Sequence, residues 1–472
     1  MTTMISPRVA VPVPQLAFDP DLIRKYDGFG PRYTSYPTAD RFTADFNASH
    51  LVDALVAREA GKLSQPLSLY VHLPFCDTIC YYCACNKVIT KDHTRAAKYI
   101  RYLGRELGIA AGLVDADTPV TQLHWGGGTP TFLSADEMTE LMEMLRTRFA
   151  FARDAECSIE IDPRKVTAEK VALLARLGFN RISLGVQDFD PDVQRAVNRV
   201  QSEEETRAVM DAARANGIGS INVDLIYGLP LQTVAGFAVT LDKVIGAAPS
   251  RIALYNYAHV PHLFKPQRRI DESALPSAEV KLAILALAIE KLTDAGYLYI
   301  GMDHFARPDD ELAVAQREGK LHRNFQGYST HADCDILSFG VSAIGRIGPT
   351  YSQNVRTLDE YYERLDANAL PCFRGWQLSY DDRLRRDVIQ ALMCQFMVDF
   401  AAIEARHGVV FEDYFAFEID ALKPLAYDGL VDIAPGRIYV TPRGRLLVRS
   451  AAMIFDRFLR EQLERKSYSR VI

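Results

Sequence analysis

The sequence of 472 residues is 48% hydrophobic, which is ample for the buried core of a large enzyme. Its net charge of −6 argues against a nucleic-acid binder, because such proteins present a strongly basic surface to the phosphate backbone. The N-terminus has no apolar run behind a basic start, and no stretch long enough to span a bilayer is free of charge. We therefore expect a cytoplasmic protein without a membrane span.

The first 66 residues form a separate segment. Its middle, Asp27–Phe42, reads DGFGPRYTSYPTADRF and is rich in Gly, Pro, Tyr and Thr. Such a composition predicts turns and extended chain rather than a core element.

From Leu67 to about residue 300, β-rich apolar runs alternate with segments of helical spacing. Six strands are predicted, at Leu67–Leu73, Thr121–Trp125, Cys157–Ile161, Arg181–Val186, Ile221–Tyr227 and Arg251–Tyr257. The helices between and after them are predicted at Ala96–Gly112, Ser134–Phe149, Ala168–Leu177, Glu203–Asn216, Val234–Ile245 and Ser277–Ala295. Six βα units predict a parallel sheet but are fewer than the eight of a closed barrel. The simplest α/β interpretation is an open, partial (β/α)6 barrel.

The pattern changes after about residue 365. Helices are predicted at Arg383–Phe400 and Ala401–Ala421, followed by a short hairpin at Gly429–Val440 and a final helix at Arg443–Leu463. This region reads as a small, mostly helical domain. The expected regions are therefore an N-terminal segment (1–66), a catalytic barrel with an extension (67–365) and a C-terminal domain (366–472).

Polar residues or glycines stand at the end of every predicted strand. The first strand runs into a cysteine-rich loop, and the others end in or near Gly126–Pro130, Glu160 and Asp162, Gln187 and Asp188, Asp224 with Tyr227–Pro230, and Asn256–His259. One such end is explained by a helix cap or a turn. Six ends that meet at one mouth predict a functional site, because chemistry in parallel α/β barrels lies at the carboxyl ends of the strands.

Four of the eight cysteines lie within ten residues, at Cys76, Cys80, Cys83 and Cys85. A large, cysteine-poor chain without a secretion signal does not suggest a disulfide framework. Structural zinc stays open as an alternative, although Cys83 and Cys85 flank a single residue and no second knuckle is present. The spacing C-x3-C-x2-C supplies three thiolates to one centre, so a four-iron cluster held there keeps one iron free for another ligand.

This spacing, with the aromatic Tyr82 just before the third cysteine, resembles the signature of the radical S-adenosylmethionine (SAM) superfamily. The resemblance implies a 4Fe-4S cluster whose open iron is chelated by the amino and carboxylate groups of SAM. It also implies reductive cleavage of SAM to a 5′-deoxyadenosyl radical, and the open partial barrel expected above.

A closer resemblance covers nearly the whole chain, from Asp27 to the C-terminus. The phrases YVHLPFC, QLHWGGGTPT, GVQDFDPDVQRAVNR, NVDLIYGLP, GMDHFA and LHRNFQGYST are similar to those of the oxygen-independent coproporphyrinogen III oxidases. The resemblance implies oxidative decarboxylation of two propionates of coproporphyrinogen III to vinyl groups, giving protoporphyrinogen IX. The alternative is a haem-binding trafficking protein on the same scaffold; those relatives usually carry Phe at the position of Cys85.

The resemblance also implies site residues. The cluster ligands are Cys76, Cys80 and Cys83. The cluster-bound SAM matches Tyr70, Gly127, Glu160 and Ile344, and a second SAM matches Tyr82, Gly128, Thr129, Gln187, Arg199, Asp224 and Ala258. Tyr82 departs from the family, which often has Phe there, but the aromatic face is kept.

Cys85 is expected not to be a ligand, because it lies close to Cys83 and a fourth thiolate would block SAM. We assign it to the radical or electron step. The substrate carries four carboxylates, so arginine partners are expected. Arg32 is the first candidate, with the N-terminal segment as a lid. We further expect an electron donor for the cluster, an electron acceptor, and a monomer.

Overall fold

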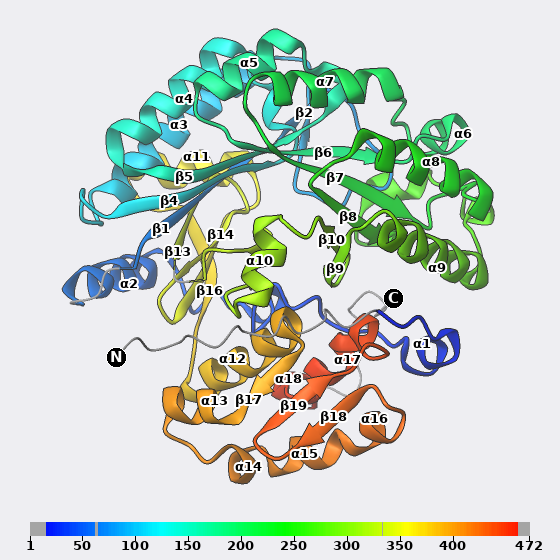
Figure 1. Cartoon of the computed structure of the whole chain (residues 1–472). Helices are drawn as coiled ribbons and strands as arrows, with labels where there is room; N and C mark the ends of the chain where they lie inside the picture. The colour runs from blue at the N-terminus through cyan, green and yellow to red at the C-terminus, as the bar shows by residue number, and fades with distance from the viewer. Residues whose placement is uncertain (1–15, 62–64, 333, 461–472) are drawn as a thin grey trace, which may run out of the picture.

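The computed structural model describes residues 16–61, 65–332 and 334–460. Its main feature is a twelve-stranded sheet (Figure 1). All six predicted strands lie side by side in it and are parallel: β1 (Leu67–Leu73), β4 (Pro119–Gly127), β5 (Ala150–Ile161), β6 (Arg181–Gln187), β7 (Ser220–Tyr227) and β8 (Arg251–Asn256). The predicted parallel α/β architecture is confirmed.

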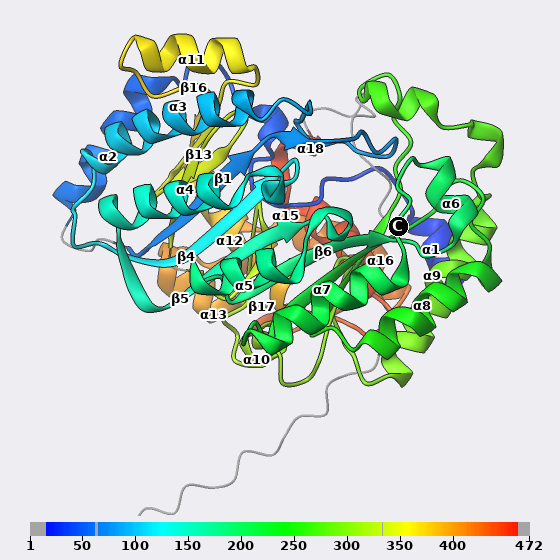
Figure 2. The same cartoon turned by 90° about the horizontal axis from the view of Figure 1, so that it is seen from above.

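The helices predicted around these strands are also present. They are α3 (Thr94–Ala111), α4 (Ala135–Arg148), α5 (Ala168–Arg176), α7 (Glu203–Ala215), α8 (Val234–Ala247) and α9 (Ala278–Asp294), with a short α6 (Pro191–Ala196) before α7. At the start of α4, the Glu137 amide donates to Ser134 Oγ at 3.2 Å and the Ser134 amide donates to the Glu137 carboxylate at 2.8 Å, a reciprocal cap. Figures 1 and 2 show these helices over one face of the sheet, with the C-terminal region on the other side.

The sheet is larger than predicted. β13 (Asp335–Phe339) pairs parallel with β1, so there are seven parallel strands instead of six. Antiparallel strands extend both edges: β14 (Ile344–Ile347), β15 (Thr350–Asn354) and β16 (Cys372–Gln377) on one, β10 (His304–Ala306) and β9 (Leu298–Gly301) on the other. These strands have three to six residues, too few for a clear alternation in the sequence.

Smaller elements complete the barrel. They are the paired strands β2 (Phe75–Cys76) and β3 (Val88–Ile89), helix α10 (Glu311–Arg317), the hairpin β11 (His322–Asn324) and β12 (Gly327–Ser329), and helix α11 (Leu358–Asp366). β2 holds the first residue of the cysteine loop next to the mouth of the barrel.

The N-terminal segment is packed more deeply than predicted. Beyond helices α1 (Pro20–Tyr26) and α2 (Ala48–Ala60), the chain between them makes bends as expected. However, Tyr33 and Tyr36 are each only 1% exposed and belong to the main core, so the expectation of no core element was wrong. The Tyr33 hydroxyl donates to Asp456 at 3.0 Å, which fastens this segment to the C-terminal region.

The C-terminal region is helical around a small sheet. The hairpin β18 (Val431–Ala434) and β19 (Arg437–Val440) matches the prediction. Helix α12 (Tyr380–Gln395) is present, but it ends earlier than the predicted Arg383–Phe400, because Met397–Asp399 forms β17, a third strand of the small sheet. The predicted single helix 401–421 was wrong: it is divided into α13 (Phe400–His407), α14 (Phe411–Tyr414) and α15 (Ala416–Ala421). Gly408, with φ of +67°, ends α13 in the left-handed conformation that glycine tolerates best.

The rest of this region is also in short pieces. α16 (Lys423–Tyr427) precedes the hairpin, and the predicted last helix consists of α17 (Val448–Ile454) and α18 (Arg457–Arg460), while its predicted end lies outside the described residues. The domain boundaries at 66 and 365 stay predictions; β16, which follows residue 366, lies in the large sheet.

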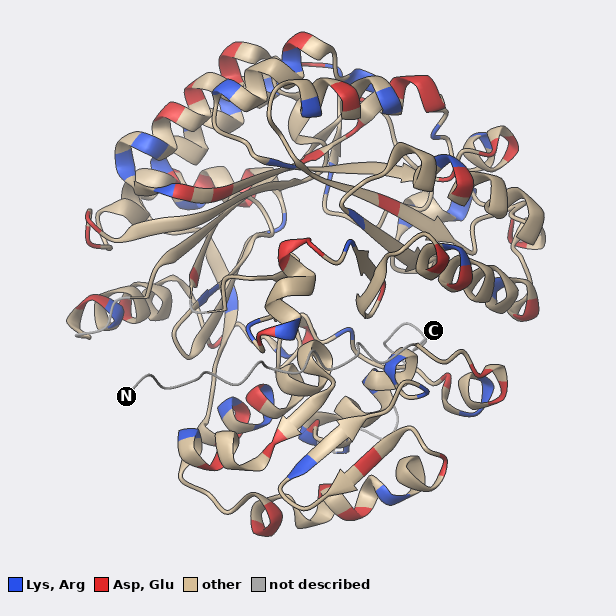
Figure 3. Cartoon of the chain, viewed as in Figure 1, with Lys and Arg blue, Asp and Glu red and all other residues tan. Residues whose placement is uncertain are grey.

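Charge is distributed by position in the fold. Figure 3 shows acidic and basic residues mixed along the outer helices, while most of the sheet is neutral. The few charged residues on the strands are therefore candidates for a site.

Among the described helices, none is both long and apolar enough to cross a membrane.

Candidate active site

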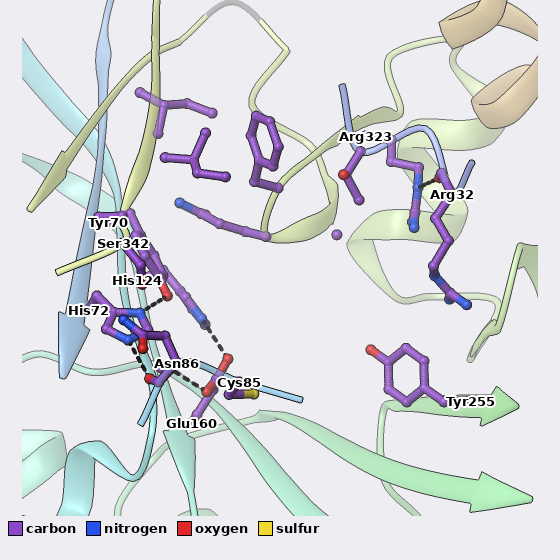
Figure 4. Close-up of a pocket in the computed structure, with 18 of the residues that line it drawn as sticks. Arg32, Tyr70, His72, Cys85, Asn86, His124, Glu160, Tyr255, Arg323 and Ser342 are labelled. Atoms are coloured by element: carbon purple, nitrogen blue, oxygen red, sulfur yellow. Dashed lines mark hydrogen bonds and ion pairs between the residues drawn. The ribbon is translucent and has the colours of Figure 1, made fainter. Parts of the chain in front are cut away.

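A cavity of about 450 Å³ opens at the carboxyl ends of the parallel strands (Figure 4). It brings together six residues singled out in the sequence: Arg32, Tyr70, Cys85, Gly127, Glu160 and Ile344. These include all four positions matched to the cluster-bound SAM. The cavity has two walls, which we call the cysteine side (Tyr70, His72, Cys85, Asn86, His124 and Glu160) and the arginine side (Arg32, Tyr255 and Arg323).

Glu160 of β5 is the acid of the cysteine side. Its carboxylate accepts from the Gly127 amide at 3.1 Å and lies 3.4 Å from His124 Nε2. Burial opposes ionisation, but the contacts with His124 and Gly127 outweigh it and lower the pKa of Glu160. The carboxyl group is therefore ionised and ready to accept hydrogen bonds from a cationic ligand.

The glycines at the end of β4 leave space beside this carboxylate. A Cβ at Gly127 would lie 2.7 Å from the His72 ring, and one at Gly126 would lie 2.9 Å from the Glu160 carboxylate. Gly127 also has a φ of +117°, which other residues rarely adopt. A side chain is therefore unfavourable at Gly127, and at Gly126 it would displace the Glu160 carboxylate.

His72 joins β1 to the cysteine loop. Its Nε2 lies 3.0 Å from the Asn86 carbonyl, and its Nδ1 lies 3.1 Å from the Tyr70 hydroxyl. Burial lowers the pKa of His72, which favours the neutral ring. Because a carbonyl oxygen only accepts, Nε2 carries the proton and Nδ1 accepts from Tyr70. This chain of contacts fixes the Tyr70 ring against the cavity.

The backbone behind this wall is fixed by helix α3. The Tyr99 hydroxyl donates to the His72 carbonyl at 2.8 Å and accepts from the Val341 amide at 3.0 Å. Glu106 accepts from the Gly340 amide at 2.7 Å and from the Tyr361 hydroxyl at 2.6 Å. The chain that runs on through Ser342 and Ala343 to Ile344, all of which line the cavity, is thereby held in place.

The cysteine loop lies in a partly cationic setting. Cys80 Sγ is approached by Arg199 Nη1 at 3.6 Å and Arg164 Nη2 at 3.9 Å. A hydrogen bond from the Cys85 thiol, with the charge of Lys87, lowers the pKa of Cys83 to about 6 despite burial. Positive neighbours favour thiolates, the form that binds metal.

The donor set suits an iron–sulfur cluster. Burial, with the charges of Cys83 and Cys80, raises the pKa of Cys76 to about 12. Within the described residues, no three His, Cys, Asp or Glu side chains are grouped as ligands of a single metal ion. Thiolates are the ligands of Fe–S clusters, and in a cubane each binds a different iron, so they need not converge on one point.

Two of the residues matched to a second SAM, Arg199 and Gln187, lie close together near Gly185, and Arg199 also reaches the cysteine loop. Arg199 Nη2 donates to the Gly185 carbonyl at 2.6 Å, and Nη1 lies 3.3 Å from Asp162. Its Nε and the Gln187 Oε1 are buried without a hydrogen-bond partner among the described residues. Gln187 also has a φ of +68°, a strained conformation for a residue with a side chain. Such unsatisfied and strained groups are typical of ligand sites.

The other members of this set are less closely gathered. Gln267 Nε2 donates to the carbonyls of Tyr82 at 3.1 Å and Ala258 at 3.2 Å, and Thr129 Oγ1 lies 3.3 Å from Cys76 Sγ. Gly128 packs against the start of the cysteine loop, since a Cβ there would lie 2.6 Å from the Pro74 carbonyl. No single described cavity contains all seven.

Asp224 lies deeper in the barrel. It lines a small cavity of about 140 Å³ that also includes Glu160. Ser183 Oγ donates to it at 3.1 Å and Asn222 Nδ2 at 2.8 Å. Burial, followed by the charge of Glu160, raises the pKa of Asp224 to about 6.

Arg323 was missed by the sequence analysis. It lies on β11, is 3% exposed, and donates through Nε to the Arg32 carbonyl at 3.3 Å. Its Nη1 is buried with no partner in the described chain, while Arg32 pairs with Asp303. Burial, with the charges of Arg323 and Arg449, lowers the pKa of Arg32 to about 10. The only signal was the phrase LHRNFQGYST, because β11 has just three residues.

An open parallel α/β barrel with a three-cysteine loop and a glycine-lined carboxylate at its mouth defines the radical SAM class. The family profile described as the radical SAM superfamily matches residues 70–244, and the HemN C-terminal domain profile matches residues 378–447. The class inferred from the sequence is confirmed.

Relatives cover nearly the full chain. Oxygen-independent coproporphyrinogen III oxidases of Salmonella typhimurium and Pseudomonas aeruginosa are each 52% identical to it, over 97% of this chain and 99% of theirs. The solved structure of coproporphyrinogen III oxidase (HemN) from Escherichia coli, described as a radical SAM enzyme, superposes with a TM-score of 0.89 at 49% identity, covering 94% of this chain and 100% of that one. The chain belongs to the oxygen-independent coproporphyrinogen III oxidase family.

Proposed function

We propose that this protein converts two propionates of coproporphyrinogen III to vinyl groups without oxygen, giving protoporphyrinogen IX. The observation that carries the proposal is a single cavity with a cofactor wall and a cationic wall. Carboxylates are the groups that buried arginines bind best, and this substrate has four of them. The haem-trafficking and zinc alternatives have no comparable support.

Cys76, Cys80 and Cys83 would hold the 4Fe-4S cluster. Tyr70, Gly127, Glu160 and Ile344 would hold the SAM beside it, with the Glu160 carboxylate accepting from the amino group of SAM. When bound, cluster and SAM supply the radical that removes a hydrogen atom from the propionate β-carbon. The Gly127 amide and His124 keep Glu160 ionised for this task.

A second SAM is proposed next to the first. Its matched residues are Tyr82, Gly128, Thr129, Gln187, Arg199, Asp224 and Ala258. The unpartnered Gln187 Oε1 and Arg199 Nε support a polar ligand there, since each would gain a hydrogen bond that the described chain does not supply.

Arg32 and Arg323 are proposed to bind substrate carboxylates. Together they orient a propionate toward the cysteine side, and the N-terminal segment acts as the lid. Arg32 and Thr34 line the cavity, while Tyr33 between them is buried and tied to Asp456. Because Tyr33 is held in this way, we propose that the lid covers the cavity as a fixed wall and does not open and close.

Cys85 is proposed to act in the radical or electron step without binding the cluster. Loss of the hydrogen atom leaves a substrate radical, which releases carbon dioxide and one electron to form the vinyl group. Cys85 lines the cavity near Glu160 (Figure 4) and is hydrogen-bonded to Cys83, a proposed cluster ligand, which supports a role in passing the electron from substrate toward the cluster. The electron donor and the acceptor are separate partners, and we propose that the protein works as a monomer.

The test is an anoxic assay of the anaerobically purified holoenzyme with coproporphyrinogen III, SAM and a reductant. We expect protoporphyrinogen IX, two carbon dioxide molecules per product, and 5′-deoxyadenosine. A protein that carries a full cluster and cleaves SAM but forms no vinyl product would overturn the proposal.

A further inference from the structure

A second basic cavity, of about 650 Å³, lies between the large sheet and the C-terminal region. Arginines line it from both sides: Arg346 from β14, Arg383 and Arg386 from α12, and Arg406 from α13. We propose that this cavity is an anion site that binds a compact molecule with two or more phosphate or carboxylate groups.

The second cavity is separate from the catalytic one, and the two share no lining residue. Strands β11 and β13 lie between them. On β11, His322 lines the second cavity and Arg323 the catalytic one; on β13, Asp335 lines the second and Ile336 the catalytic one. Successive side chains of a strand point to opposite faces, which explains this alternation.

The charges in the cavity do not balance. Its two acids are already paired: Asp335 accepts from Arg58 Nε at 2.9 Å, and Asp387 lies 3.4 Å from Arg386, 3.1 Å from Arg406 and 2.9 Å from His407. Arg346 and Arg383 make no ion pair with any described residue. Two guanidinium groups therefore face the cavity without a counterion.

Two guanidinium nitrogens also lack an acceptor. Arg346 Nε and Arg386 Nη1 are buried and have no hydrogen-bond partner among the described residues. A buried N–H without an acceptor is costly, and an anion would satisfy both. Burial, with the charges of Arg346, Arg386 and Arg406, lowers the pKa of His322 to about 3, as expected for a strongly positive enclosure.

The arrangement fits a polyanion better than a single small ion. Guanidinium groups pair with phosphate and carboxylate through two parallel hydrogen bonds. The four arginines come from three elements around a cavity larger than the catalytic one, so one ligand must present several anionic groups to reach them. Pyrophosphate and citrate are simple probes of the two chemistries.

The test is calorimetric titration of the full-length holoenzyme at low salt with pyrophosphate, with citrate and with inorganic phosphate. Arg383 is exposed and its side chain makes no hydrogen bond with the described residues, so Arg383→Ala should fold normally. We expect it to weaken binding of the preferred probe about tenfold or more, the effect of losing a charge-assisted hydrogen bond. Arg153→Ala, an exposed arginine on β5, is the matched control and should bind as the unmodified protein does.

The three probes identify the ligand. Preference for pyrophosphate indicates a phosphate compound, and preference for citrate indicates a polycarboxylate. The proposal is overturned if none of the three binds at millimolar concentration, or if Arg383→Ala and Arg153→Ala bind equally well. It is also overturned if Arg323→Gln abolishes binding while Arg383→Ala does not, because the anion would then occupy the catalytic cavity. Coproporphyrinogen turnover is measured in parallel and is independent of this result.

Discussion

The two walls of the catalytic cavity differ in how many of their polar groups have hydrogen-bond or ion-pair partners in the protein. On the cysteine side, Tyr70, His72 and Asn86 form one chain of contacts, and His124 and Gly127 engage Glu160. On the arginine side, Arg32 has the single carboxylate of Asp303, and Arg323 keeps a buried N–H without a partner. The first wall is organised in advance by its own contacts, whereas the second keeps buried positive charge with few partners, in agreement with the proposed roles of cofactor binding and substrate binding.

Serine replacements in the cysteine loop should have the largest effects and should separate two roles. Cys80→Ser should lose the cluster and all turnover, because each iron needs its thiolate. Cys85→Ser should keep about four irons per chain and the cluster absorbance, yet lose turnover about 100-fold or more, as expected when a reacting group is removed. Iron analysis measures the cluster content of each variant, and the anoxic assay measures its turnover.

Cys157→Ala is the control, because Cys157 is a buried cysteine of the same barrel outside the loop. It should keep both iron and turnover. Iron loss in Cys85→Ser would show that Cys85 is a ligand and would remove the distinction between the two roles.

Arg323→Gln should weaken the function of the arginine side and leave that of the cysteine side unchanged. Losing a charge-assisted contact with a substrate carboxylate should raise the KM for coproporphyrinogen III about 10- to 100-fold. Cleavage of SAM to 5′-deoxyadenosine should persist, since the cysteine side is intact. Steady-state kinetics with both substrates make the measurement.

Arg317→Gln, on α10 and outside the cavity, serves as the matched control. A rise in the KM for SAM of the same size in Arg323→Gln would mean that the two walls are not functionally separate.

Glu106 tests the support behind the cysteine side, and its removal should have the smallest effect, which is on the free energy of unfolding. It is 2% exposed, and burial raises its pKa from 4.5 to about 7. Between these pH values the folded protein binds more protons than the unfolded chain, so stability falls as pH rises. From pH 5 to pH 7 this group should cost about 2 kcal/mol, a loss that Glu106→Gln should not show.

Chemical denaturation of both proteins at the two pH values measures the difference, with Glu140→Gln on α4 as an exposed control. Equal pH dependence in the unmodified protein and Glu106→Gln would show that Glu106 is ionised in the folded state and that its hydrogen bonds outweigh burial.

Much of the fold could be predicted because its central strands and helices are long and regularly patterned. The six parallel strands were placed correctly, whereas β13–β16 were missed because four to six residues leave little alternation to detect. The buried Tyr33 and Tyr36 were missed for another reason: their partners lie at the far end of the chain, which local composition does not reveal.

The residues of the candidate site also fall into those that could be predicted from the sequence and those that could not. Residues at strand ends, such as Glu160, and the clustered cysteines could be found because the pattern is local in the sequence. Arg323 could not, since it contacts Arg32 across 291 residues and lies on a three-residue strand. Its role depends on tertiary packing alone.

The contact between Tyr33 and Asp456 has a consequence for the order of assembly. It spans 423 residues, so the segment that carries Arg32 can be locked in place only when nearly the whole chain has been synthesised. All six residues of the cysteine side precede Asn256, the last residue of β8. This side can therefore begin to form early in synthesis, before β13 and Ile344 pack beside it, whereas the arginine side, which needs both Arg323 and the segment of Arg32, closes last.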